Sequence, residues 1–152
     1  MGAVRNRLAE LGLELPVVVP PLAAYVPAVR SGDLVFTAGQ LPFVDGKLPA
    51  VGKVGAEVDV DTAKSLARQC ALNALAAINN VVDIDNIEQV VKVVGFVASA
   101  PDFTGQPAVV NGASELMQEI FGDAGIHARS AVGMAVLPLD APVEVEFIVR
   151  VR

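Results

Sequence analysis

The sequence predicts an α+β fold in which a β-sheet carries two helices on one face. Segments with strand and helix periodicity follow one another as hairpin, helix, strand, helix, strand and strand. Two helices cannot cover both faces of such a sheet, so we expect them to share one face. Hydrophobic residues reach 53% of the 152 residues and charged residues only 18%, below the usual ~25%. This excess of apolar side chains predicts that other subunits cover the second face.

The first predicted element is a β-hairpin near the start of the chain. Two short runs, Tyr25–Arg30 and Asp33–Gln40, are separated by Ser31 and Gly32, which is typical of a tight turn between strands. The preceding Leu15–Pro27 is rich in proline, so we expect it to be extended and to lie on the body of the domain.

A long helix is predicted over Thr62–Val82, with Asp59 or Asp61 as its N-cap. A strand over Val90–Ala98 and a helix near Ala108–Phe121 follow it. The long helix has one buried face, because its apolar residues recur three and four positions apart: Ala63, Leu66, Ala67, Cys70, Ala74, Ile78 and Val81.

Two strands are predicted in the last third of the chain. Ala131–Leu137 is apolar at every position except Gly133, which predicts burial on both faces. Val143–Val151 alternates, so its valines share one face while Glu144 and Glu146 share the other.

Composition limits the classes of function that the chain can serve. The length predicts a single domain over residues 1–152, with a proline-rich extension over 1–24. The net charge of −6 argues against a nucleic-acid partner and against anionic membranes. One cysteine, Cys70, and one histidine, His127, exclude a disulfide and a multi-thiolate or multi-histidine metal site. Prolines interrupt Leu15–Val29, so we expect no membrane span. Met1–Gly12 carries charged residues, so we expect no secretory signal, and the single cysteine is typical of a cytoplasmic protein.

The candidate functional residues each have two interpretations. Arg129, at the entry to an apolar strand, predicts either a structural salt bridge or a site for a ligand carboxylate. Glu144 and Glu146 belong either to a solvated surface or to a cleft in which one of them transfers a proton. Tyr25 by default packs against its neighbours, and Asn111 by default caps a helix.

Three segments resemble the YjgF/Rid superfamily, whose members are called reactive intermediate (enamine/imine) deaminases or endoribonuclease L-PSP. Ala128-Arg129-Ser130-Ala131-Val132, continuing through Leu137-Pro138 to Val143–Glu146, is similar to the family's closing signature. The segment from Ser31 to Pro42 is similar to its early hairpin, and Val110-Asn111 to the start of its second helix. The resemblance spans about residues 22–152 and indicates a longer branch of roughly 150 residues.

The resemblance implies a chorismate-mutase-like fold, with a mixed sheet, two helices on one face and a homotrimeric barrel with clefts between subunits. It implies hydrolysis of a small 2-imino acid, or its enamine tautomer, to a 2-keto acid and ammonia, without a metal or organic cofactor. Arg129 would bind the substrate carboxylate and Glu144 would handle the water and the proton. Tyr25, Gly39 and Asn111 would lie near the cleft.

The chain departs from the deaminase pattern at two positions. Ala131 stands where deaminases usually carry cysteine, and Gly133 where they often carry glutamate. Ala131 still counts as substrate-binding, because the family cysteine contributes mainly through its backbone. We expect a wider, less polar pocket. The competing hypothesis is a non-catalytic trimeric module that binds a small carboxylate metabolite. The net negative charge of the chain disfavours an endoribonuclease.

Overall fold

The computed structural model describes residues 2–18, 21 and 24–152. Within them the chain forms three α-helices, five strands and three short 3₁₀ turns. In order these are α1 (Ala3–Glu10), β1 (Ala28–Ser31), β2 (Leu34–Thr37), α2 (Val60–Asn79), the turn Ile84–Asn86, β3 (Ile87–Ala98), α3 (Gln106–Phe121), the turn Gly122–Gly125, β4 (Ala128–Met134), the turn Pro138–Asp140 and β5 (Val143–Val151). No helix among the described residues is long and apolar enough to cross a membrane.

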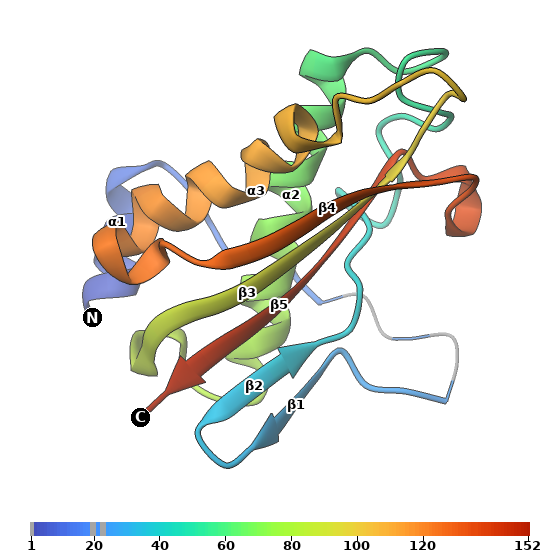
Figure 1. The fold of residues 1–152 in the computed structure, drawn as a ribbon. Coiled ribbons are helices and arrows are strands. Elements are labelled where there is room, and N and C mark those ends of the chain that lie inside the picture. Colours follow the sequence, from blue (N-terminus) through green and yellow to red (C-terminus); the bar gives the residue numbers. More distant parts are fainter. Residues whose placement is uncertain (1, 19–20, 22–23) are drawn as a thin grey trace.

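The strands form one mixed sheet in the order β1-β2-β5-β3-β4, in which only the β3–β4 pair is parallel. Helices α2 and α3 lie on the same side of this sheet, as predicted (Figure 1). We call that side the helix face and the other the open face. Gly95 on β3 pairs with Ala131 and Val145, whereas Phe96 pairs with Val132 and Glu144. Paired residues point to the same face, so Glu144 and Val132 lie on the open face.

The core lies between the sheet and the two long helices. Asp59 is the N-cap of α2, because its side chain accepts a hydrogen bond of 2.7 Å from the backbone N–H of Thr62. Helix α3 crosses α2 closely at Gly112, where a Cβ atom would overlap the backbone carbonyl oxygen of Lys64. This contact fixes α3 above the sheet and so fixes the residues that α3 presents to β4.

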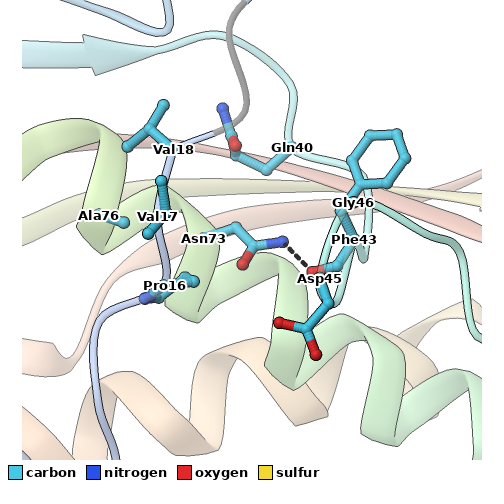
Figure 2. Close-up of a pocket in the computed structure, with 9 residues that line it drawn as sticks. All are labelled: Pro16, Val17, Val18, Gln40, Phe43, Asp45, Gly46, Asn73 and Ala76. Carbon is cyan, nitrogen blue, oxygen red and sulfur yellow. Dashed lines mark hydrogen bonds between the residues drawn. The ribbon is translucent and has the colours of Figure 1, made fainter.

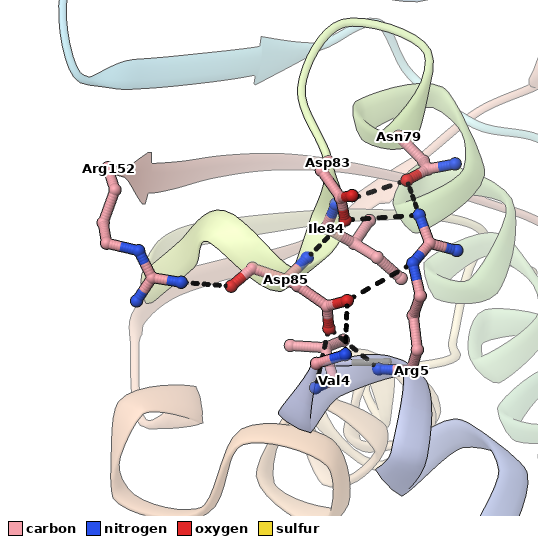
Figure 3. Close-up of polar contacts among 8 residues, drawn as sticks. Val4, Arg5, Asn79, Asp83, Ile84, Asp85 and Arg152 are labelled. Carbon is pink, nitrogen blue, oxygen red and sulfur yellow. Dashed lines mark hydrogen bonds and ion pairs between the residues drawn. The ribbon is translucent and has the colours of Figure 1, made fainter.

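Helix α1 is joined to the domain by polar contacts with the end of α2 and with the 3₁₀ turn that precedes β3, shown in Figure 3. The Asp85 carboxylate accepts hydrogen bonds of 3.0 Å from the N–H groups of both Val4 and Arg5, so it caps α1 from a distant segment. The Arg5 guanidinium donates to Asn79 at 2.8 Å and contacts Asp83 at 3.2 Å. The amphipathic start of the sequence is therefore a docked helix.

The structure corrects three expected elements. The long helix begins earlier and ends at Asn79, and the strand expected from Val90 begins at Ile87. The expected burial of Ala131–Leu137 on both faces is not met within one chain. Strand β4 ends at Met134 and lies at the edge of the sheet, with Val132 42% exposed. An edge strand has one neighbour, so its apolar composition does not bury it within one chain.

Candidate functional site

Arg129 bridges β4 and α3 on the helix face. It pairs in the sheet with the buried Val93, so its side chain extends under α3. The Nη1 atom donates hydrogen bonds to Asn111 Oδ1 at 2.8 Å and Ser114 Oγ at 3.2 Å. The Nη2 atom donates to the Pro107 carbonyl oxygen at 3.3 Å. Helix α3 begins at Gln106, so Asn111 lies in its second turn. Asn111 is therefore not the N-cap of the helix, and its side chain instead binds the Arg129 guanidinium.

The Arg129 guanidinium keeps two donors for a ligand. It has five N–H groups, of which three are used by Asn111, Ser114 and Pro107. Within the described part of the chain, the Nε–H and one Nη2–H have no hydrogen-bond partner and no ion pair involves this side chain. All three acceptors are neutral, so a half-buried positive charge remains without an acidic partner. Of the two interpretations of Arg129, this arrangement favours the ligand carboxylate.

Ser114 and His127 extend this arrangement, and sequence reasoning missed them as site residues. The His127 Nδ1 atom lies 2.6 Å from the Gly125 carbonyl oxygen, which can only accept, so Nδ1 carries the proton. In the neutral ring Nε2 is then an acceptor, and the Ser114 hydroxyl donates to it at 2.8 Å. We call Asn111, Ser114, His127 and Arg129 the arginine cluster. Its sequence signal is spacing: Ser114 lies three residues after Asn111, and His127 lies two residues before Arg129.

Ala131 and Gly133 follow Arg129 along the helix face of β4. A Cβ atom at Gly133 would lie 2.9 Å from Gln106 Nε2 and 3.1 Å from Ser99 Oγ. The space beside Gly133 therefore holds an amide and a hydroxyl, which donate and accept a hydrogen bond of 3.1 Å between them. Gln106 and Ser99 therefore supply polar groups beside Gly133, and the expectation of a wider, less polar pocket stays a prediction.

Glu144 lies on the open face, between the buried Val143 and Val145 in sequence. Gly39 packs directly against it, because a Cβ atom at position 39 would overlap the carboxylate Oε2. Burial raises the pKa of Glu144 above its ordinary value, and the negative charge of Glu146 raises this pKa further. A carboxyl group with a raised pKa is suited to proton transfer near neutral pH.

The two acids on this face have different surroundings. Glu146 lines a hollow of about 100 Å³ together with Phe36 and Lys92, and Glu144 is not among the residues that line it. Tyr25 lies at the start of the hairpin, where the Ala38 N–H donates to the Pro27 carbonyl oxygen. Its side chain is 54% exposed and has no hydrogen bond within the described residues.

Five of the six predicted site residues, all except Tyr25, thus form two groups on opposite faces of the sheet. Arg129, Asn111 and Ala131 lie on the helix face, whereas Glu144 lies on the open face against Gly39. The sheet itself separates them, so one chain does not bring the arginine and the glutamate to one ligand. A site that uses both needs two chains.

A separate cavity of about 430 Å³ lies between residues 16–18, α2 and the loop after β2 (Figure 2). Asn73 has a structural role in this cavity, because its side-chain amide nitrogen donates to the carbonyl oxygens of Leu41 at 3.0 Å and Phe43 at 3.1 Å. Its oxygen accepts from Gln69 at 3.0 Å. The cavity includes Gln40, next to Gly39, but none of the predicted site residues.

Cys70 has the properties of a buried hydrophobic residue. Its thiol is buried on α2, and burial raises its pKa well above the ordinary value, with a further contribution from the negative charge of Glu144. A thiol of this kind stays protonated, so Cys70 is not an activated nucleophile.

A family model, curated relatives and solved structures all place this chain among the same group of proteins. Residues 5–150 match the model of the family described as "YjgF/chorismate mutase-like, putative endoribonuclease". Protein TCP17 of Trypanosoma cruzi is 41% identical over 99% of this chain and 96% of its own length. The crystal structure of Atu1372, a protein of unknown function from Agrobacterium tumefaciens, is 45% identical with a TM-score of 0.91, covering 99% of this chain and 94% of that one.

A more distant neighbour is the crystal structure of Escherichia coli TdcF with bound serine. It is 26% identical with a TM-score of 0.65 and covers 89% of this chain and 93% of that one. Its curated name is "Putative reactive intermediate deaminase TdcF", at 29% identity over 84% of this chain and 86% of its own length. The match to the family model spans nearly the whole chain, and on that ground the chain belongs to the YjgF/chorismate-mutase-like family.

Proposed function

We propose that the protein is an enamine/imine deaminase-type hydrolase that converts a small 2-imino acid into a 2-keto acid and ammonia. The observation that carries this proposal is Arg129, which keeps two N–H donors and an unpaired positive charge beside α3. A planar guanidinium with two donors suits a carboxylate. Support comes from the relative named "Putative reactive intermediate deaminase TdcF", whose crystal structure contains bound serine, a small molecule with a carboxylate.

In this proposal Arg129 fixes the substrate carboxylate and so places the imine carbon. Water adds to that carbon: Glu144 takes a proton from the water as the C–O bond forms and gives this proton to the nitrogen, which produces a carbinolamine. Glu144 then takes the remaining hydroxyl proton and passes it to the nitrogen, so that the C=O bond forms, the C–N bond breaks, and ammonia and the 2-keto acid leave. Gly39 leaves room for the Glu144 carboxylate, and Asn111 holds the guanidinium. Tyr25 and the backbone at Ala131 complete the walls.

The placement of Arg129 and Glu144 on opposite faces leads us to propose that the site lies between adjacent subunits of a homotrimer. One chain would supply the arginine cluster, and its neighbour would supply Glu144 with Gly39. The apolar side chains of the open face, such as Val132, support this assembly, since a second chain would cover them. We propose a cytoplasmic location, small carboxylates as ligands, and no nucleic-acid or membrane partner.

The test is ammonia release from 2-imino acids generated in situ by an amino-acid oxidase. We expect the protein to accelerate this release and Glu144→Gln to reduce the turnover by about 10²-fold, with a smaller effect on keto-acid binding. Glu146→Gln is the matched control, because it removes an acid from the same strand face. Equal and mild effects of both changes would contradict a catalytic role for Glu144.

A second candidate function is a module that binds a small carboxylate without catalysis. The groups nearest to Gly133 favour it, because the Gln106 amide and the Ser99 hydroxyl are both neutral and neither is an acid. Keto-acid binding without acceleration of ammonia release would identify this function.

A further inference from the structure

We infer that Ser114 and His127 are positioning residues that hold Arg129 in the orientation in which it binds a carboxylate. The inference rests on the proposed carboxylate-binding role of Arg129. It follows from one continuous series of hydrogen bonds, which runs from the Gly125 carbonyl through His127 and Ser114 to Arg129.

The direction of this series is fixed at its first contact. The Gly125 carbonyl requires a proton on Nδ1 of His127, so Nε2 of the neutral ring accepts from the Ser114 hydroxyl. A hydroxyl has a single proton, and once that proton points to His127 the oxygen presents its lone pairs to its other neighbour. That neighbour is Nη1 of Arg129, at 3.2 Å. Each bond in the series therefore sets the direction of the next.

The consequence for Arg129 concerns which of its donors stay available. Asn111 Oδ1 and Ser114 Oγ both accept from Nη1, so both hydrogens of that nitrogen are held by α3. The donors left for a ligand are the Nε–H and one Nη2–H. Ser114 is only 7% exposed, so water cannot readily replace its oxygen as the acceptor. Loss of that acceptor would leave a donor unpaired and free the guanidinium to turn away from the ligand.

Two substitutions at His127 distinguish a role in positioning Arg129 from a role in packing alone. In His127→Asn the amide nitrogen lies near the position of Nδ1 and can still donate to the Gly125 carbonyl, but the side chain does not reach Ser114. In His127→Gln the side-chain oxygen reaches the position of Nε2 and can accept from Ser114, but the hydrogen bond to Gly125 is lost. A merely structural histidine would be replaced better by Asn. A positioning histidine would be replaced better by Gln.

His127 is the only histidine of the chain, so its ring gives one pair of ¹⁵N signals in NMR spectra. We expect the free protein to show the Nδ1–H tautomer. Titration with pyruvate should move the His127 Nε2 signal with the same dissociation constant that calorimetry gives. In Ser114→Ala the ring signal should no longer follow the titration.

The decisive measurement is pyruvate affinity across the variants, with melting temperatures recorded for each. We expect three- to tenfold weaker binding in Ser114→Ala and His127→Asn, the effect of one lost hydrogen bond, and near-native binding in His127→Gln. Ser65→Ala, at an exposed serine of α2, is the control. Equal binding by His127→Asn and His127→Gln, or tighter binding by the Asn variant, would overturn the positioning role. Absence of wild-type binding, or binding unaffected by Arg129→Lys, would instead overturn the proposed function and with it this inference.

Discussion

Arg129 is the residue whose interpretation changes most between the sequence and the structure. The sequence leaves a salt bridge and a ligand carboxylate open, and the contacts with Asn111, Ser114 and Pro107 favour a ligand, because they supply only neutral acceptors. No sequence pattern indicates how many donors of a guanidinium remain free. That number depends on where α3 crosses β4.

Replacement of Arg129 by Lys keeps the charge and loses the planar pair of donors. We expect keto-acid binding to weaken by about 1.5–3 kcal/mol, or roughly 10- to 150-fold, in titration calorimetry. Arg150→Lys is the control, because Arg150 is exposed and pairs with Glu88 at the surface. Unchanged affinity in Arg129→Lys would reject the carboxylate role.

Glu144 should make stability depend on pH in a defined direction. Burial raises its pKa in the folded chain above the unfolded value, so the folded state resists ionisation. Stability is therefore unaffected below the unfolded pKa and falls as pH rises toward the folded pKa. Glu144→Gln removes the carboxyl whose ionisation destabilises the folded chain. The variant should therefore melt at a higher temperature than the wild type at pH 7 and at nearly the same temperature at pH 4. The same difference at both pH values would contradict this assignment.

At the level of elements, strand β5 could be predicted well and β4 could not. The alternation of Val143–Val151 gives the correct bounds and places Glu144 and Glu146 on one face. An apolar run such as Ala131–Leu137 looks the same in a central strand and in an edge strand that another chain covers. The partners of Arg129 were also beyond sequence reasoning, because Ser114 and His127 meet only through the packing of α3 on β4.

The close crossing of α2 and α3 gives a prediction about elements. Gly112→Ala would place a methyl group against the backbone of α2 at Lys64, which cannot turn aside as a side chain can. We expect a loss of about 2 kcal/mol in the free energy of unfolding by urea denaturation. Gln118→Ala, at an exposed position of the same helix, should change it by less than about 0.5 kcal/mol. Similar changes in the free energy of unfolding for the two variants would show that α3 can move away from α2 without loss of stability.

For the whole molecule, the open face predicts association. We expect light scattering to give a mass close to three times the 15.7 kDa of one chain. Val132→Lys places a charge on the exposed apolar part of the open face and should shift the protein toward monomer, whereas Gln118→Lys on α3 should not. A monomer at micromolar concentration would contradict both the assembly and a site shared between chains.

The separation of Arg129 from Glu144 by the sheet has a consequence for genetics. Two defective alleles, one encoding Arg129→Lys and one Glu144→Gln, should complement each other when both are expressed in one cell. Random mixing of the two chains in a closed ring would give about a quarter of the clefts an intact arginine from one neighbour and an intact glutamate from the other. Co-expressed chains should therefore recover part of the deaminase activity that neither allele supplies alone. A site contained in a single chain would give no such recovery, and the double mutant co-expressed with itself is the negative control.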